Sequence, residues 1–368
     1  MPPIMGAGAF LMAEITGIPY LQIVIAAIIP ALLFYIGDFI VIDLRARKDG
    51  IKPVPDEEIP KWSQAFNLEA VLQLIIPILL IVFFLVQGAS VQYAGSRALA
   101  WVIIVFVVLN RHHLIRDKLK ILLQSFEKAG YSMATLAALA FVAQIVVSLI
   151  SATGVGLKFS QLIISIGGEN MVAVLLLAML VCIILGMGMP TTAAYVLSAS
   201  LVAPALINLG TPTLTAHMFV FYFAIISTIT PPVCTGIYTV AQIAEVKWQK
   251  IVPDAIKLGL VGFIVPFMFI YNSALLMQGS VLEITAVFLV KILGIAALGV
   301  TTVGYLDVSL NVYLRGAFLV GAILTITPGW ATNILGVIVI VAVFVFYKFN
   351  LKKKALNLAL KNSKTSVE

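Results

Sequence analysis

Charged residues are scarce in this sequence. Asp, Glu, Lys and Arg make up 11% of its 368 residues, whereas hydrophobic residues make up 62%. A soluble domain carries roughly 25% charged residues, and the apolar residues here form repeated long runs. The composition therefore excludes an ordinary soluble domain. It predicts an all-α polytopic membrane protein surrounded by the lipid bilayer.

Residues that commonly carry catalysis are also few. The two cysteines, Cys182 and Cys234, lie inside apolar stretches without metal-ligand spacing, and the three histidines form no HExxH motif. No Walker motif is present, so the chain itself is not expected to hydrolyse ATP. An intramembrane enzyme that uses His112 or His113 is the least favoured hypothesis. We predict no catalytic residue and no cofactor.

The positive charge is confined to short segments. The net charge is +7, but the basic residues lie in loops and near the C-terminus, which is typical of an oriented membrane protein and not of a nucleic-acid-binding surface. A crossing helix needs about 20 mostly apolar residues. The expected crossings are 20–42, 69–87, 94–110, 132–153, 258–276, 284–304, 312–327 and 331–349.

Two regions depart from simple crossings. The segments 171–184 and 193–207 are each short and are joined by the tip 186–192, which reads GMGMPTT. Apolar runs of about 10–14 residues are typical of re-entrant pieces, so we predict a re-entrant hairpin. Residues 216–245 form one long apolar stretch that Thr230-Pro231-Pro232 cuts in the middle, which predicts a broken helix.

The basic residues test this layout. If residues 171–207 enter and leave the membrane on one side, five segments share one face and hold 20 of the 23 Lys and Arg residues. These segments are 43–68, 111–131, 246–257, 305–315 and the tail from Lys348. The positive-inside rule places them, with the C-terminus, in the cytoplasm of a bacterial or archaeal cell. Two complete crossings would give the same count, and the shortness of both arms favours the hairpin.

The hairpin tip and the helix break supply groups that can bind ions. Glycines permit unusual backbone angles and prolines withdraw an N–H donor, which frees carbonyl groups. Freed carbonyls and threonine hydroxyls suit a small cation such as Na⁺, and half-helix N-termini favour an anion. The candidate residues are Gly186, Gly188, Met189, Pro190, Thr191, Thr192, Thr228, Thr230, Pro231 and Pro232, with Na⁺ expected near Gly188, Thr191 and Thr230. A pair of proline kinks that only shape packing is the alternative.

The start of the sequence echoes the break. Pro2-Pro3-Ile4-Met5-Gly6 opens a half-helix with small residues, as does the stretch from Pro231-Pro232 to Gly236. From the charge layout, the first half-helix runs outward and the second runs inward. Similar sequence in opposite directions is typical of an inverted repeat. Pro2 and Pro3 therefore join the candidate site residues.

Glu14, Asp38 and Lys291 are ionisable residues within apolar segments. An intramembrane ionisable group is a site candidate by default. We expect Asp38 to lie near the cytoplasmic end of its helix, Glu14 to cap a half-helix, and Lys291 to reach the interface or pair within the bundle.

Several stretches resemble one known family. They are Gly186–Tyr195 with Leu201–Ala205, Phe219–Phe223 with Thr230–Pro232, Gly262–Phe267 with Tyr271-Asn272, and Pro2–Gly6 through Gly17–Pro19. In these stretches the chain resembles the large membrane (permease) subunit of TRAP transporters, of the fused-permease type. The resemblance covers nearly the whole chain and is most specific at Gly186–Tyr195.

The resemblance implies a function. It implies an elevator-type, Na⁺-coupled secondary importer of organic anions (carboxylates) that is fed by a periplasmic binding protein of the TAXI class. It also implies two inverted repeats, each with a re-entrant hairpin followed by a broken helix. The tip Gly186–Thr192 is similar to the second hairpin, and Thr228–Pro232 is similar to the second break.

The sequence also departs from the family pattern, because it begins at the first break. We therefore expect the first hairpin and the preceding small-subunit-like helices to be missing, so that the chain holds a C-terminal portion with half of the transport site. An inactive or split-gene fragment that needs this N-terminal part is the alternative. The expected divisions are the end of the first repeat (1–42), a cytoplasmic connector (43–68), scaffold helices (69–153) with a cytoplasmic amphipathic segment (111–130), the hairpin and broken helix (154–245), C-terminal helices (246–349) and a basic tail (350–368).

Overall fold

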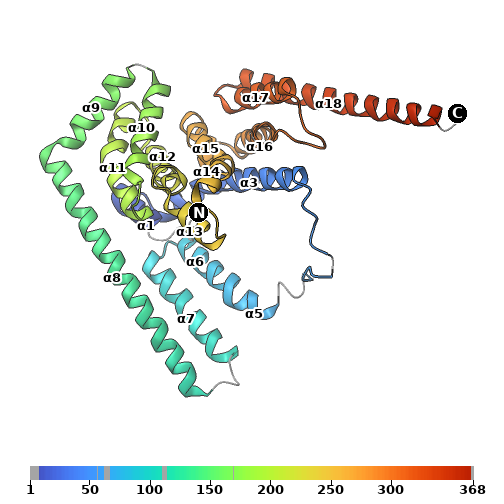
Figure 1. Ribbon diagram of the computed structural model, residues 1–368. Coiled ribbons are helices and arrows are strands. Elements are labelled where there is room, and N and C mark those ends of the chain that lie inside the picture. Colours follow the sequence, from blue (N-terminus) through green and yellow to red (C-terminus); the bar gives the residue numbers. More distant parts are fainter. Residues whose placement is uncertain (1–7, 56, 62–66, 110–113, 169, 366–368) are drawn as a thin grey trace.

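The computed structural model describes residues 8–55, 57–61, 67–109, 114–168 and 170–365 (Figure 1). The first half of the chain forms α1 (Gly8–Thr16), α2 (Tyr20–Ala26), α3 (Ile28–Lys48), α5 (Leu68–Ala70), the π-helix η1 (Val71–Ile75), α6 (Ile76–Val86), α7 (Val91–Leu109), α8 (Ile115–Thr153) and α9 (Val155–Gly167). The second half forms α10 (Met171–Gly186), α11 (Thr191–Asn208), α12 (Thr213–Ile226), the 3₁₀-helix η2 (Ser227–Ile229), α13 (Thr235–Ile243), α14 (Trp248–Leu258), α15 (Leu260–Tyr271), the 3₁₀-helix η3 (Ser273–Leu276), α16 (Val281–Val303), α17 (Val312–Ile326) and α18 (Trp330–Thr365). Every named element in these residues is helical.

The apolar runs of the sequence become helices of membrane-spanning length. In the described residues, six stretches are long and apolar enough to cross a bilayer: Tyr20–Lys48, Val91–Leu109, Thr191–Asn208, Trp248–Tyr271, Val281–Val303 and Trp330–Leu351. Val71–Val86, Met171–Gly186, Thr213–Ile229 and Val312–Ile326 are shorter apolar helices. The expected all-α polytopic membrane fold is confirmed.

Helix ends follow from local chemistry. Asn311 and Ser280 sit at N-caps, where their side-chain oxygens accept the backbone N–H groups of Leu314 and Glu283 at 2.8 and 3.2 Å. The end of α16 is Gly304, whose φ of +68° is the left-handed conformation that glycine adopts at low cost. These caps fix where α16 and α17 begin and end.

Two boundaries differ from the sequence prediction. Residues 115–153 form the single 39-residue helix α8, so the amphipathic segment expected at 111–130 continues into the expected crossing 132–153 without a break. The junction contains Gly130 but no proline, and a single glycine lowers helix stability without ending the helix, which explains the continuity. The arm expected at 193–207 begins earlier, at Thr191, and is an 18-residue helix.

Several basic segments meet at one end of the bundle. The contacts are Lys48 Nζ to the Val303 carbonyl at 2.7 Å, Arg45 to Asp254 at 3.6 Å, and Lys348 to Asp307 at 2.7 Å. Exposed ion pairs contribute little to stability, but these show which loops are neighbours. The residues around Arg45, the segments 246–257 and 305–315 and the residues around Lys348 thus share one end, as predicted for these four basic segments, while segment 111–131 makes none of these contacts.

The hydrophobic core of the central bundle lies around α12, which packs against α10, α11 and α15. The aromatic rings of Phe219 and Phe223 are fully buried and pack edge-on against each other and against Phe267 of α15. Helices α10 and α11, the two arms of the expected hairpin, both pack against α12. In Figure 1, α5–α7 and α8 extend away from this centre as an arm, and α16–α18 lie on the other side. The central bundle therefore positions the hairpin and the break.

Candidate functional site at the hairpin tip and the helix break

Helices α10 and α11 form a helical hairpin. Asn170 begins it by accepting the backbone N–H groups of Val172 and Ala173 at 3.0 and 3.3 Å. The turn between the helices runs from Gly186 to Pro190, and Gly188 has a φ of +73°. A residue with a Cβ is strained at that angle. The glycines and proline of the motif therefore build a tight, non-helical tip, as predicted.

The second apolar stretch is broken as predicted. Helix α12 ends at Ile226, tightens into the 3₁₀ turn η2, and gives way to extended backbone at Thr230, which has φ −98° and ψ 127°. The Pro231-Pro232 peptide is cis. Neither proline can donate a backbone hydrogen bond, so the helix cannot continue, and α13 starts afresh at Thr235.

The hairpin tip lies directly against the break. A Cβ atom on Gly186 would lie 2.8 Å from Ser227 Cβ, which is closer than real atoms approach. A Cβ on Gly188 would lie 3.4 Å from Val233 Cγ1, beyond the proline pair. Two motifs that are some 40 positions apart in the sequence thus meet in space. Only glycine allows the approach at Gly186.

The hydroxyl groups of the break are oriented by the last turn of α12. Ser227, Thr228 and Thr230 donate their hydroxyl hydrogens to the carbonyls of Ala224, Ile225 and Ile226 at 2.7, 2.8 and 2.8 Å. A hydroxyl has one hydrogen and two acceptor lone pairs. With their hydrogens engaged, these oxygens keep their lone pairs for a cation. In α11, Thr191 and Thr192 are half-buried in the first turn, beside the tip.

The packing of α12 and α3 near Gly262 indicates how deep in the membrane the break lies. A Cβ on Gly262 of α15 would touch both Phe34 of α3, at 3.0 Å, and Ile226 at the end of α12, at 3.3 Å. Phe34 lies midway along the apolar segment Tyr20–Lys48. The break is therefore level with the middle of a membrane-length segment, where unpaired backbone groups need polar partners.

The sequence-predicted residues are thus partly brought together. Gly186, Gly188, Met189 and Pro190 form the tip, and Thr191 and Thr192 start the following helix, while Thr228, Thr230, Pro231 and Pro232 form the break. Pro2 and Pro3 lie outside the described residues, as do His112 and His113. In the part of the chain that the structure describes, no cluster of three His, Cys, Asp or Glu side chains could hold a metal ion.

Helices α3 and α15 run in opposite directions. The segment after α1 starts beside η3 and runs as α3 to the end marked by Lys48, whereas α15 runs from that end back toward η3. The predicted echo between Pro2–Gly6 and Pro231–Gly236 stays a prediction, because Pro2–Gly6 lie outside the described residues.

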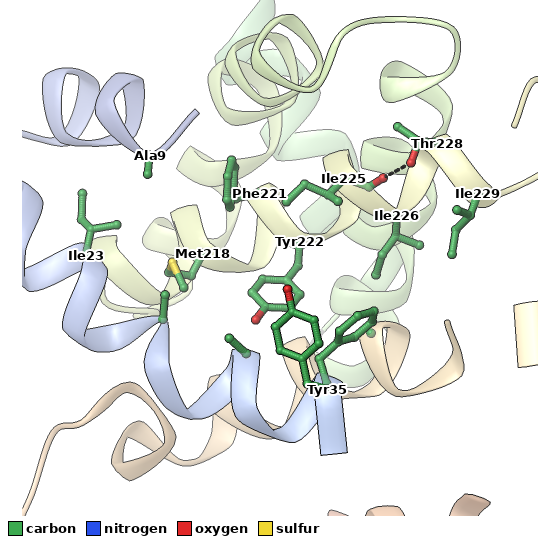
Figure 2. A pocket seen from close by; sticks show the side chains of 14 residues that line it. Ala9, Ile23, Tyr35, Met218, Phe221, Tyr222, Ile225, Ile226, Thr228 and Ile229 are labelled. Atoms are coloured by element: carbon green, nitrogen blue, oxygen red, sulfur yellow. Dashed lines mark hydrogen bonds between the residues drawn. The ribbon is translucent and has the colours of Figure 1, made fainter. Parts of the chain in front are cut away.

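A cavity of about 290 Å³ opens between α1–α3 and α12, beside the break (Figure 2). Its wall is mostly alanine, isoleucine, phenylalanine and methionine. The exceptions are the hydroxyls of Tyr35, Tyr222 and Thr228, and the Thr228 hydroxyl donates to the Ile225 carbonyl. Figure 2 shows the two tyrosine rings side by side. Sequence reasoning did not select either tyrosine as a site residue: Tyr35 lies outside the stretches that carry the resemblance, and Tyr222 lies within Phe219–Phe223 but next to no glycine or proline break.

A buried hydrogen bond supports the hairpin. The Tyr195 hydroxyl of α11 and His217 Nδ1 of α12 are 2.8 Å apart, and Tyr195 is fully buried. The ring of Tyr195 also packs edge-on against Phe221. The sequence shows His217 as an isolated histidine, because its partner is on another helix. The pair ties the second arm of the hairpin to the helix that carries the break.

Lys291 also has partners that the sequence does not reveal. It is 1% exposed, and its ammonium donates to the Thr325 carbonyl at 2.5 Å and to Asn333 Oδ1 at 3.1 Å. The carbonyls of Ile326 and Thr327 lie at 3.4 Å. These carbonyls end α17, where a helix leaves acceptors unpaired and carries partial negative charge. Lys291 therefore pairs within the bundle, which was one of its two expected placements.

Comparison with known proteins gives one finding. A family model described as Tripartite ATP-independent periplasmic transporter, DctM component, matches residues 1–284. A search of curated proteins returned no match. A search of solved structures also returned none. The matched residues include α1–α3, the hairpin and the broken helix.

Proposed function

The chain belongs to the DctM component family of tripartite ATP-independent periplasmic transporters, and on this premise we propose that it is the permease part of a Na⁺-coupled importer of organic anions. Members of this family are transport components, with a periplasmic binding protein as partner and the membrane as their site. The Na⁺ coupling and the carboxylate substrate are our proposal. The proposed orientation places the C-terminus in the cytoplasm.

The observation that carries the proposal is the contact between the hairpin tip and the helix break, at Gly186 and Ser227. Na⁺ is a hard cation, and hydroxyl and carbonyl oxygens are its suitable ligands. The tip supplies bent backbone at Gly188, and the break supplies the oriented hydroxyl of Thr230. Together with Thr191, these groups form the proposed Na⁺ site.

Two helix N-termini favour an anion in the same region. Helix α11 starts at Thr191 beside the tip, and α13 starts at Thr235 just after the break. Each N-terminus carries unpaired N–H groups and roughly half a positive charge. These partial charges favour an anionic substrate in the region of the break, and the bound cation would add a full positive charge. Na⁺ and anion would therefore bind cooperatively, which is what coupled transport requires.

We propose that the complete transporter has further components. The described residues supply one hairpin and one break, and we propose that an N-terminal permease portion completes the site. A binding protein of the TAXI class would deliver the substrate, and the hairpin with its broken helix would move against the scaffold as an elevator. If the chain is instead an inactive fragment, no uptake will occur whichever N-terminal portion is supplied, whereas a split-gene fragment will give uptake only with its own N-terminal part.

The valine variant of Thr230 tests the site. Thr230→Val keeps the side-chain shape and removes the oxygen, so we expect the thermal stabilisation by NaCl to need at least tenfold more salt than in the parent protein. Thr285→Val is a matched control, because Thr285 makes the same bond to the carbonyl four residues earlier, also at 2.8 Å, on the distant helix α16. The measurement is the melting temperature of the purified chain in NaCl and in choline chloride. Equal curves for both variants would contradict the proposed Na⁺ site.

Transport itself is tested in liposomes. Uptake of labelled carboxylates should need an inward Na⁺ gradient, the binding protein and the N-terminal portion together. Uptake by this chain alone without Na⁺ would refute the proposed function.

A further inference from the structure

We propose that the cavity beside the break binds a monocarboxylate with a compact apolar body, and that Tyr35 and Tyr222 hold its carboxylate. This inference rests on the proposed function and narrows its substrate class. The cavity adjoins Thr228 of the break, whose neighbour Thr230 belongs to the proposed Na⁺ site. A ligand there would be in reach of the moving part of the transporter.

The size and lining of the cavity determine how large and how apolar the part of the ligand beyond its carboxylate can be. The volume of about 290 Å³ is roughly twice that of a 150 Å³ apolar cavity that takes benzene. Around it stand residues such as Ile23, Met218 and Phe221, which offer no hydrogen bond (Figure 2). An aromatic or branched aliphatic body fits such a wall, because its burial is favourable and strands no polar group.

The same wall disfavours polyhydroxy acids. A hydroxyl buried without a partner weakens binding by about tenfold or more. Among the polar groups of the wall, the Thr228 hydrogen is already donated to Ile225. Two phenol groups that already bind the carboxylate cannot also form hydrogen bonds with several substrate hydroxyls. The lining therefore selects against sugar acids.

The two tyrosines set the polar end. Their rings lie side by side on the cavity wall, and neither hydroxyl has a hydrogen-bond partner within the described part of the chain (Figure 2). Two phenolic O–H groups can each donate to one carboxylate, and such charge-assisted bonds are the strong ones. No described lysine, arginine or histidine lines the cavity. The balancing positive charge would come from the coupling ion, so binding should strengthen with Na⁺.

Equilibrium dialysis of the purified full-length chain tests this inference. The probes are radiolabelled 3-phenylpropionate for a water-soluble apolar acid, gluconate for a polyhydroxy acid, and oleate for a fatty acid from the membrane, each in NaCl and in choline chloride. We expect 3-phenylpropionate to bind at least 100-fold more tightly than gluconate, and more tightly in NaCl. Equal or tighter binding of gluconate would overturn the proposal. Binding of oleate alone would assign the cavity to a membrane lipid and would overturn it too.

Variants connect the binding to the cavity. Tyr222→Phe keeps the ring and removes one donor to a charged acceptor, so binding of 3-phenylpropionate should weaken about tenfold or more. Ala31→Leu fills the cavity and should abolish binding. Tyr238→Phe is the control, because Tyr238 packs on Trp248 away from the cavity. Unchanged binding by a Tyr222→Phe protein that melts like the parent would refute the assignment.

The result can be separated from the test of the proposed function. If Thr230→Val alters the response to NaCl while no apolar acid binds, this inference fails and the Na⁺ site stands. If 3-phenylpropionate binds while NaCl has no effect on either the melting temperature or the binding, the Na⁺ coupling fails, and with it the charge balance that the inference assumes.

Discussion

Replacement of Gly186 by alanine tests whether the hairpin tip is docked on the helix break. The added Cβ would lie 2.8 Å from Ser227 Cβ and 3.3 Å from the Ala224 carbonyl oxygen, and closer still to the Ser227 hydroxyl. Ser227 is 1% exposed, and its hydroxyl is held by the Ala224 carbonyl at 2.7 Å. Because the neighbour is buried and bonded, it cannot turn away, and the tip must shift.

The magnitude follows from two opposing effects. Overpacking a close contact by one carbon costs about 1–3 kcal/mol. Alanine in place of a helical glycine returns about 0.5–1 kcal/mol, and Gly186 is the last residue of α10, where the gain is small. We therefore expect Gly186→Ala to lower the free energy of unfolding by about 1–2 kcal/mol. The shifted tip should also weaken the response to Na⁺.

The assay is unfolding of the purified protein in detergent, followed with and without NaCl. Gly95→Ala is the matched control, because Gly95 is a helical glycine of α7 with no atom near its missing Cβ. That control should be stabilised by about 0.5–1 kcal/mol. Ser227→Gly should relieve the clash, so that the double variant is more stable than additivity predicts, by at least about 0.5 kcal/mol. A Gly186→Ala protein that behaves like Gly95→Ala, with no coupling to Ser227→Gly, would refute the docked tip.

Three further predictions concern the rest of the bundle. Tyr195→Phe leaves His217 Nδ1 buried without its partner and should destabilise the protein by about 1–3 kcal/mol in the same unfolding assay; an unchanged stability would show that the bond contributes nothing. Lys291→Met removes the hydrogen bonds that the ammonium donates to carbonyls at the end of α17 and to Asn333 of α18, which outweighs the relief of a buried charge, so a net loss of about 1–3 kcal/mol is expected. Adding Asn333→Leu should restore part of that stability, since the stranded amide is gone. In a cysteine-free background, a cysteine at position 348 should react with an impermeant thiol reagent from the cytoplasmic side only, and labelling from outside would invert the proposed orientation.

Much of the fold could be predicted from the sequence because membrane helices are specified locally. A segment such as 281–303 must satisfy its backbone within itself, so length and apolar content suffice to identify it. The hairpin tip and the break were also predictable, since glycine and proline act on their own backbone at Gly188 and Pro232. The helix α8 shows the limit: composition changes along it near residue 131, but a change from polar to apolar surface does not end a helix.

The helical hairpin and the broken helix, and the confinement of basic residues to particular loops, were determined by the sequence alone, because backbone chemistry and charge act on the residues that carry them. Contacts between distant elements were decided only by the tertiary structure. Gly186 contacts Ser227, Lys291 donates a hydrogen bond to Asn333, and Tyr35 lies beside Tyr222 on the wall of an apolar cavity. Each of these pairs joins two helices. The hydrophobic periodicity of the sequence does not specify how these helices are placed relative to each other, because the packing of their side chains brings them together.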